Sequence, residues 1–364
     1  MASSSGGGNM KPMELQHMIA GTAGGLVSTV ALYPLELIKT RMQVSDVRIA
    51  APGRLASGSA AMSSSVVRAH AMAGPYSSLY SSARTVLKQE GLAGFYKGVV
   101  PAVVASAGSW GAYFYLYEYS KKRKLRYNRQ HGIDSGGKLG VTDHLLSGVE
   151  AGVTLVFAFN PLWLIKTRLA LQGACLGDQG GLAAQPQYSG AYHAFRTIIR
   201  EEGVAGLYKG ILPALFLTSH GAVQFATYEK LKVLSEVHLS QESRESAPWA
   251  VAVLCGGVSK IIASTVTYPY QVIKSRLQQR DELVASPSSG APNKGVVSPA
   301  TATTTTTILK PRYEGTADCV RKIWRQEGLA GYFRGVVPNA LKVAPSAALT
   351  FVVYEETLRA LARR

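Results

Sequence analysis

Two short motifs recur in the same order three times along this chain, and this repetition constrains the fold more than any other feature of the sequence. The first is a proline followed at fixed spacing by a lysine, a hydroxyl residue and an arginine. It occurs at Pro34–Arg41, Pro161–Arg168 and Pro269–Arg276. The second is a Glu-Gly pair followed by an aromatic residue, a basic residue and a glycine. It occurs at Glu90–Gly98, Glu202–Gly210 and Glu327–Gly335. The recurrence predicts three homologous units of about a hundred residues each.

Each unit contains two weakly charged apolar stretches, and about 20 such residues suffice to cross a bilayer. Buried helices of a soluble bundle are the alternative, but two stretches in every unit are too regular for that. The sequence therefore predicts an all-α membrane protein with six transmembrane helices. The stretches are Met18–Tyr33, Val99–Tyr117, Leu145–Asn160, Ile211–Tyr228, Trp249–Tyr268 and Val336–Tyr354.

A short amphipathic helix is predicted between the two apolar stretches of each unit. Apolar residues stand seven, four and three positions before the Glu of the second motif, which is the spacing of one helix face. The glycine after that Glu is typical of a helix end. We expect these three helices to lie on the membrane surface. Their apolar positions are Ala83, Val86 and Leu87; Phe195, Ile198 and Ile199; and Val320, Ile323 and Trp324.

The remaining segments are connectors. Two of them are rich in Ala, Ser, Thr, Pro and Gly, a composition that cannot bury enough apolar area to become ordered. We therefore expect both to be disordered insertions on the same membrane face. The predicted division is a disordered N-terminus (1–13), unit 1 (14–122, insertion 45–74), unit 2 (142–233) and unit 3 (248–360, insertion 280–311).

The formal net charge is +17, yet the basic residues are dispersed over the repeats, and no nucleic-acid motif accompanies them. We therefore expect no nucleic-acid partner. No nucleophile with a base and no set of metal ligands converges in the sequence, and Cys175, Cys255 and Cys319 are widely separated. We expect no enzyme activity, metal or cofactor.

The paired motifs, three times over, resemble those of the mitochondrial carrier family from about residue 14 to residue 360. The resemblance implies a pseudo-threefold barrel of six tilted helices around a central solute cavity that opens alternately to either side. It implies a monomer in the mitochondrial inner membrane, or alternatively in the chloroplast envelope. Met1–Lys11 lacks the Arg-rich amphipathic pattern of a transit peptide.

The resemblance assigns six residues of the first motif to a gate at the matrix side, here called the matrix ring. It implies contacts of Glu36 with Lys166, of position 163 with Lys274, and of position 271 with Lys39. Trp163 and Gln271 stand where the family has carboxylates, so a cation–π contact and a hydrogen bond replace two ion pairs. Gln43 and Gln278 match the bracing glutamines of the family, and Ala170 does not. The ring comprises Glu36, Lys39, Trp163, Lys166, Gln271 and Lys274.

A second set of charges at the ends of the even-numbered spans matches the cytoplasmic gate of the family. The implied pairs are Lys121 with Glu229 and Lys232 with Glu355. Leu358 occupies the third basic position, which leaves Glu118 without its usual partner. This cytoplasmic ring comprises Glu118, Lys121, Glu229, Lys232 and Glu355.

Solute contact points of the family fall at Ala105, Leu217 and Lys342, of which only Lys342 is charged. A cation within a span is costly and therefore expected to be functional. Lys260 is either a second solute ligand or a structural partner, and His220 is either a cavity donor or a packed residue. The candidate solute ligands are Lys342, Lys260, His220, Gln224, Ser109, Trp110 and Tyr113.

Three segments, Asn160–Arg168, Ser219–Phe225 and Tyr268–Arg280, are similar to the folate and FAD carriers of the family. Both solutes join a flat heteroaromatic ring to an anionic tail, which Lys342 could neutralise. NAD and pyrimidine nucleotides are alternative solutes, and a non-transporting membrane adaptor is an alternative function.

Glycines stand where the even-numbered spans are predicted to begin, each beside a basic residue. Helix N-termini expose unpaired N–H groups that favour phosphate. The family resemblance implies cardiolipin, or another anionic lipid, at Gly98, Gly210 and Gly335.

Overall fold

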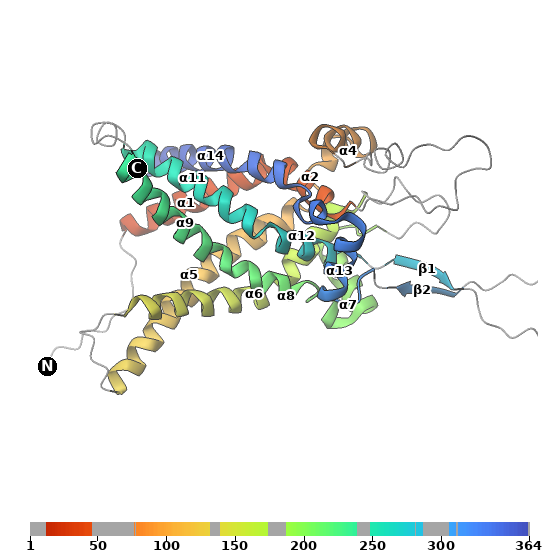
Figure 1. Ribbon diagram of the computed structural model, residues 1–364, viewed down its shortest axis with the longest axis horizontal. Coiled ribbons are helices and arrows are strands. Elements are labelled where there is room, and N and C mark those ends of the chain that lie inside the picture. Colours follow the sequence, from red (N-terminus) through yellow and green to blue (C-terminus); the bar gives the residue numbers. More distant parts are fainter. Residues whose placement is uncertain are drawn as a thin grey trace, which may run out of the picture.

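The computed structural model describes most of the chain and shows a bundle of long helices with shorter helices across one end (Figure 1). The predicted disordered N-terminus lies almost wholly outside the described residues, as does most of the insertion at 45–74. The described residues are 12–45, 76, 78–131, 139–173, 187–238, 248–280, 282–286, 306–310 and 312–362.

The first unit begins with a bent pair of helices, α1 (Pro12–Ala31) and α2 (Tyr33–Val44), whose axes meet at 58°. Pro34 lies in the first turn of α2, where its missing N–H cannot continue the preceding helix. The surface helix α4 (Leu79–Gly94) and the long helix α5 (Val99–Gln130) complete the unit.

The second unit begins with α6 (Val141–Leu171), which continues through Pro161 as one helix. The surface helix α7 (Ala191–Gly206) follows. The second span is interrupted: α8 (Ile211–Phe216) passes through a short 3₁₀ turn, η1 (Leu217–Ser219), into α9 (His220–His238).

The third unit repeats the broken first span, with α11 (Pro248–Val266) followed by α12 (Tyr268–Leu277). The surface helix α13 (Thr316–Glu327) leads through the 3₁₀ turn η2 (Leu329–Phe333) into α14 (Val336–Ala362). All three surface helices are thus present where the apolar spacing predicted them.

One expectation about the connectors is wrong. The segment 280–311 begins and ends in strands, β1 (Glu282–Ser286) and β2 (Thr306–Lys310), which pair antiparallel with Glu282 opposite Lys310. Composition averaged over the segment concealed two short runs that contain β-branched Val, Ile and Thr residues, which favour strands. The part between the strands, 287–305, lies outside the described residues.

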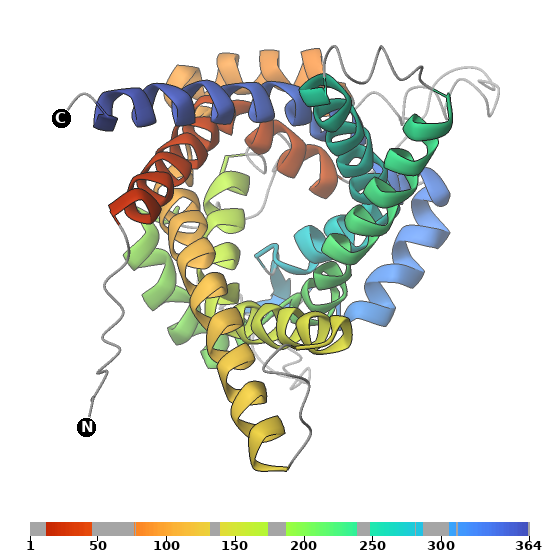
Figure 2. The ribbon, with the colours of Figure 1, turned by 90° about the vertical axis from the view of Figure 1, so that its left-hand side faces the viewer.

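Within the described residues, three helices are individually long and apolar enough to cross a membrane, and the bent pair formed by α1 and α2 is a fourth candidate. The three single helices are α5, α6 and α14. Seen end-on, the helices of the three units form a ring (Figure 2). This is an all-α fold of a membrane protein with three repeats; the full count of six spans stays a prediction.

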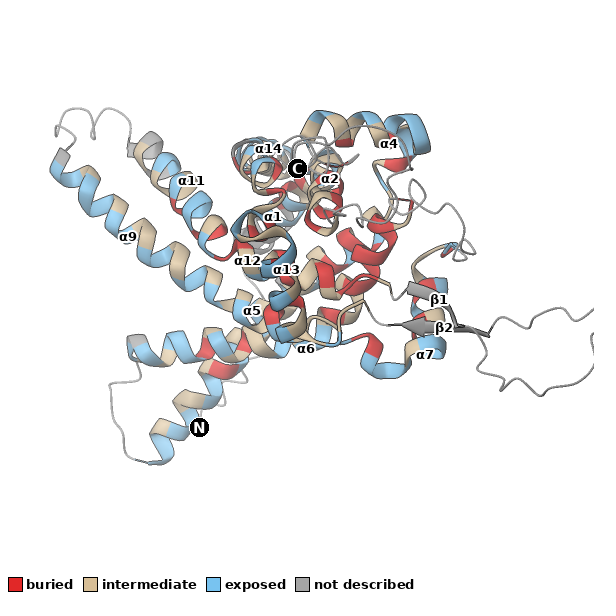
Figure 3. Ribbon diagram, turned by 45° about the vertical axis from the view of Figure 1, so that its right-hand side comes forward, coloured by how far each residue is buried: buried red, intermediate tan, exposed pale blue. Residues whose placement is uncertain are grey.

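Burial is concentrated where α2, α6 and α12 meet the surface helices (Figure 3). Each unit has its own apolar cluster there, and each cluster joins the first motif to the surface helix. Leu37 and Val86 belong to the first cluster, Leu164 and Ile198 to the second, and Val272 and Ile323 to the third.

A buried ion pair in every unit strengthens the same junction. The arginine of the first motif donates to the glutamate of the second at 2.5 Å in each case, and the paired side chains are at most 6% exposed. The pairs are Arg41–Glu90, Arg168–Glu202 and Arg276–Glu327.

The same arginines also join neighbouring units. Arg41 Nε donates to the carbonyl of Ala170 at 2.9 Å, Arg168 Nε to that of Gln278 at 3.2 Å, and Arg276 Nε to that of Gln43 at 3.0 Å. These three bonds close a circle, so the ends of α2, α6 and α12 form one connected assembly.

Candidate solute pathway and its two rings

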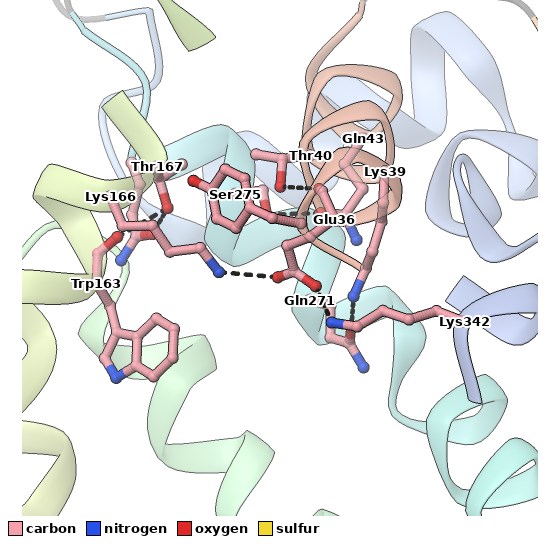
Figure 4. Close-up of polar contacts among 12 residues, drawn as sticks. Glu36, Lys39, Thr40, Gln43, Trp163, Lys166, Thr167, Gln271, Ser275 and Lys342 are labelled. Atoms are coloured by element: carbon pink, nitrogen blue, oxygen red, sulfur yellow. Dashed lines mark hydrogen bonds and ion pairs between the residues drawn. The ribbon is translucent and has the colours of Figure 1, made fainter. Parts of the chain in front are cut away.

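The matrix ring is assembled at the convergence of α2, α6 and α12 (Figure 4). Lys166 Nζ lies 2.8 Å from Glu36 Oε1, and Lys39 Nζ donates to Gln271 Oε1 at 2.9 Å. Each contact joins two different units. Both were predicted from the positions of these residues in the motif.

Trp163 supplies the third contact. Lys274 Nζ lies over its indole ring, 5.9 Å from the ring centre, as predicted, and Lys166 Nζ lies over the same ring at 4.9 Å. A cation is attracted to the negative face of an indole. Trp163, which replaces a carboxylate of the family pattern, therefore still contacts Lys166 and Lys274.

Of the three bracing positions, Gln43 and Gln278 form hydrogen bonds to a neighbouring unit, and Ala170 does not. Thr167 Oγ1 bonds to Gln278 Oε1 at 3.0 Å, and Ser275 Oγ donates to Gln43 Oε1 at 2.8 Å. At the remaining interface Ala170 offers no polar side chain, and Thr40 instead donates to the carbonyl of Glu36 in its own helix at 2.9 Å. The interface between the first and second units thus has one bond fewer.

Lys342 makes a contact that the sequence pattern did not predict. On α14 it forms an ion pair with Glu36 Oε2, so one carboxylate binds two lysines through its two oxygens. The sequence pattern treated Lys342 as a solute ligand and Glu36 as a ring residue. In the structure they belong to one network (Figure 4).

The other candidates of units two and three lie near one another, on α9 and α11. A cavity of about 280 Å³ is lined by Gln224, Phe225, Tyr228, Gly221 and Ser259. His220 Nδ1 lies 3.0 Å from the hydroxyl of Thr267, so this histidine has a hydrogen-bond partner in the adjacent unit. Lys260 follows Ser259 on α11, is solvent-exposed, and has no ion-pair partner among the described residues.

The α5 candidates show less convergence. Ser109 Oγ donates to the carbonyl of Ser106 in its own helix at 3.1 Å. The ring of Tyr113 stacks on that of Tyr117, with centres 6.2 Å apart. The side chain of Trp110 lies outside the described residues.

At the cytoplasmic ring the predicted pairs are wrong for this structure. Lys121 Nζ binds Glu118 of its own helix at 2.8 Å, and Glu355 contacts Arg359 at 3.5 Å. In the described part of the chain, neither Glu229 nor Lys232 has an ion-pair partner. The physical reason is the packing: α5 packs on α6, α9 on α11 and α14 on α1, so the three even-numbered spans do not converge at this end.

Glu150 of α6 contributes to the packing between α5 and α6. Its carboxylate accepts from Ser120 Oγ at 2.7 Å and pairs with Arg123 at 2.7 Å. This supports a structural role for the charge.

The three glycines expected at lipid sites stand at the starts of α5, α8 and α14, with φ angles of +84°, +76° and +81°. A side chain there would also collide with the neighbouring unit: a Cβ on Gly98 would lie 2.9 Å from the carbonyl of Lys166. The adjacent basic side chains of Lys97, Lys209 and Arg334 pair with the glutamates of the surface helices. Glycine is therefore required here for packing, whether or not lipid binds.

Two surface-helix carboxylates have perturbed acidities. Burial of Glu90 disfavours its charged form, but hydrogen bonds from Arg41 and Lys97 outweigh burial and hold its pKa below the usual value. Arg168 and Lys209 lower the pKa of Glu202 in the same way, against the same opposing burial. Both carboxylates are thus ionised partners of buried arginines.

Sequence reasoning missed one recurring contact. Tyr33 and Tyr268, each directly before the proline, donate their hydroxyls to the carbonyls of Lys97 and Arg334 at 2.9 and 3.0 Å. Asn160, at the same position, donates to the carbonyl of Leu207 at 2.8 Å. A hydrogen-bonding side chain before all three prolines was the available signal.

Comparison with known proteins agrees with this architecture. The family described as "Mitochondrial carrier protein" matches residues 12–128, 137–238 and 245–364. The chain is 37% identical over 354 residues to "Folate transporter 1, chloroplastic" of Arabidopsis thaliana, with 95% of each chain covered.

Two further relatives are 33% identical. "Nicotinamide adenine dinucleotide transporter 2, mitochondrial" of Arabidopsis thaliana aligns over 93% of this chain and 78% of its own. "Mitochondrial substrate carrier family protein M" of Dictyostelium discoideum aligns over 94% and 95%. With its three repeats and apolar helices, the chain belongs to the mitochondrial carrier family of multi-pass membrane transporters.

Proposed function

We propose that this protein carries an anionic heteroaromatic solute, folate or FAD, across an organelle inner membrane by alternating access. The observation that carries this proposal is the difference between its ends. At the matrix ring Glu36, Lys39 and Trp163 contact residues of another unit, whereas at the cytoplasmic ring Lys121 and Glu355 pair within their own helices. That is the arrangement of a carrier closed at one end.

The choice of folate is supported by the relative with that printed name, over almost the entire length of both chains. Relatives named as nicotinamide adenine dinucleotide transporters support NAD as the alternative, and pyrimidine nucleotides stay a further alternative. All these solutes combine a flat ring with negative charge. Phe225 and Tyr228 at the α9–α11 cavity offer aromatic faces, and Lys342 and Lys260 offer charge.

Uptake into liposomes containing the purified protein tests this proposal. We expect accumulation of labelled folate or FAD above that of protein-free liposomes, with NAD and a pyrimidine nucleotide as comparison solutes. Preference for NAD would replace the solute assignment. Failure to move any of them, with the protein correctly folded, would favour the non-transporting adaptor.

We place the protein in the mitochondrial inner membrane, with the chloroplast envelope as the alternative, because relatives with both printed locations align with it. A fluorescent fusion imaged beside markers for both organelles distinguishes the two. Plastid fluorescence alone would reject the mitochondrial assignment.

We further propose an anionic lipid, cardiolipin above all, at the starts of the even-numbered spans, bound to a monomer. A cavity of about 160 Å³ lies between Gly210 and the start of α13, with Lys209, Arg312 and Gly315 in its wall. Phosphate suits exposed N–H groups beside basic residues. The melting temperature of the detergent-purified protein should rise on adding cardiolipin, and no rise would end this proposal.

A further inference from the structure

The closed end of the molecule carries more positive than negative charge. Lys166 and Lys342 bind the carboxylate of Glu36, whereas Lys39 and Lys274 of the same matrix ring contact the neutral Gln271 and Trp163. Among the described residues, Lys39 has only the neutral Gln271 as a hydrogen-bond partner, and Lys274 has only the indole of Trp163. An anion that enters from the open side therefore meets an uncompensated cluster of cations.

The two lysines on Glu36 are not equivalent. Lys166 binds Oε1 and its side chain is 11% exposed, whereas Lys342 binds Oε2 and is 29% exposed. Glu36 itself is 21% exposed. Lys342 also stands at the position that corresponds to a solute contact point, so it is the member of the trio that a solute can reach first.

We propose that Glu36 is an internal competitor for the solute: its carboxylate occupies Lys342 until the anionic group of the solute displaces it. Lys166 stays on the other oxygen, so Glu36 keeps a counter-ion during the exchange. Binding thereby frees α14 from α2 while the contact between α2 and α6 persists. This inference rests on the proposed transport of an anion and adds how Glu36 limits the affinity for it.

A second lysine, Lys260, indicates how many negative charges the anionic group of the solute carries. Lys260 is exposed on α11, and α11 packs against α14, the helix that carries Lys342. Lys260 has no ion-pair partner among the described residues. A solute anion bound to Lys342 therefore lies on the helix next to the one that carries Lys260. The site thus suits a group with two negative charges, such as a dicarboxylate or a pyrophosphate, better than a monoanion.

The first experiment measures binding of inorganic pyrophosphate, and of whichever solute the wild-type protein transports, to the purified full-length protein by calorimetry. Glu36→Gln removes the competitor, and affinity should rise by about fivefold to tenfold, because a site occupied most of the time binds with a correspondingly reduced apparent affinity. Lys342→Gln should abolish this gain when combined with Glu36→Gln. Glu36→Asp, one methylene shorter, should give a smaller gain and serves if Glu36→Gln does not fold.

Ser275→Ala is the matched control, because it removes the Ser275–Gln43 bond at the same end without releasing a lysine or touching Lys342. It should leave pyrophosphate affinity unchanged. Equal tightening by Ser275→Ala, or no tightening in either Glu36 variant, would overturn the competition. A wild-type protein that transports no anion but still shows the predicted pyrophosphate shifts would instead reject the proposed function and leave the competition standing.

The second experiment compares glutarate with valerate, which have the same chain length and differ by one charge. Wild-type protein should bind glutarate more tightly, and Lys260→Gln should remove that preference without lowering valerate affinity. Equal binding of the two acids by wild-type protein, or a preference that survives Lys260→Gln, would show that Lys260 does not contribute the second charge.

Discussion

At the end where α2, α6 and α12 meet, polar contacts run from one unit to the next, whereas at the opposite end they stay within a helix or between adjacent helices. Lys166 reaches Glu36 across units, but Lys121 reaches only Glu118, three residues away. The sequence has charged motifs at both ends. A charge pattern therefore specifies which ion pairs can form, and the conformation of the protein decides which of them do form.

The two ends also differ in the burial of the ion pairs near each ring. Buried arginine–glutamate pairs fix the closed end to the surface helices, with Arg276 and Glu327 at 1% and 2% exposure. At the opposite end Arg359 is 63% exposed, and its pairs with Glu355 and Glu356 are open to solvent. Exposed pairs contribute about 0–1 kcal/mol each, which suits an end that must rearrange.

The largest effect is expected from breaking one of the buried pairs. Glu202→Gln leaves Arg168 buried without a carboxylate, which should lower the free energy of unfolding by about 3–5 kcal/mol. Thermal unfolding in detergent measures it. The control is Arg196→Ala on the exposed face of the same surface helix, which should change little. A similar melting temperature for both variants would show that the pair does not stabilise the closed end.

The second-largest effect is expected from removing the positive charge of Lys342. Lys342→Ala should weaken solute affinity by about 2–5 kcal/mol, by analogy with truncating a buried charge pair. Lys342→Arg keeps the charge and should retain measurable transport, although its planar fork cannot reproduce the contact of an ammonium. Apparent affinities come from liposome uptake against solute concentration. A wild-type affinity in Lys342→Ala would place the binding cation elsewhere, with Lys260→Ala as the companion variant.

The only carboxylate of the matrix ring gives the third test. Glu36→Gln leaves this end held by the Lys39–Gln271 bond and the contacts of Trp163. Transport should slow or become leaky, while solute binding should persist and tighten as the competition for Lys342 predicts. Uptake and passive efflux from the same liposomes separate the two effects. An unchanged rate together with an unchanged leak would mean that the ring is no gate.

Much of the closed end could be predicted from the sequence because its contacts follow from fixed spacing. The three surface helices, the glycines that end them and the contacts of Trp163 and Gln271 all depend on residues whose relative positions the repeats dictate. The bond between Lys342 and Glu36 could not be predicted in this way. Those residues lie 306 positions apart, and only the fold shows that the start of α14 approaches α2.

The ion pairs predicted for the cytoplasmic ring are absent from the described residues for another reason. Those pairs belong to a conformation in which α5, α9 and α14 converge. A sequence encodes all states of a carrier at once and does not indicate which one a single structure shows. The strands β1 and β2 were missed because the composition of the whole segment 280–311 was used instead of its local β-branched runs.

Acid should weaken the closed end selectively. The pKa values of Glu90 and Glu202 are lower in the folded protein than the ordinary value of 4.5. Their pairing therefore stabilises the fold fully above about pH 4.5 and is lost as the pH falls through the lower folded-state values. Melting temperature should be level from pH 8 to pH 5 and then decline. Glu202→Gln should decline less steeply, and an identical slope would exclude this carboxylate as a cause.

The smallest effect concerns the interface that lacks a brace. Gln278→Ala and Gln43→Ala make the other two interfaces resemble the one that Ala170 already occupies. Each change removes one hydrogen bond, to Thr167 or Ser275, and should cost about 0.5–1.5 kcal/mol of stability. Because Gln278 Nε2 and Gln43 Nε2 are buried without a partner in the described structure, removing them also relieves a desolvation cost. The expected loss of stability therefore lies toward the lower limit.

Melting temperatures of the two single variants and of the double variant measure this loss of stability. The losses should add, because each glutamine braces a different interface, and a strongly non-additive double variant would show instead that the three interfaces open as one unit.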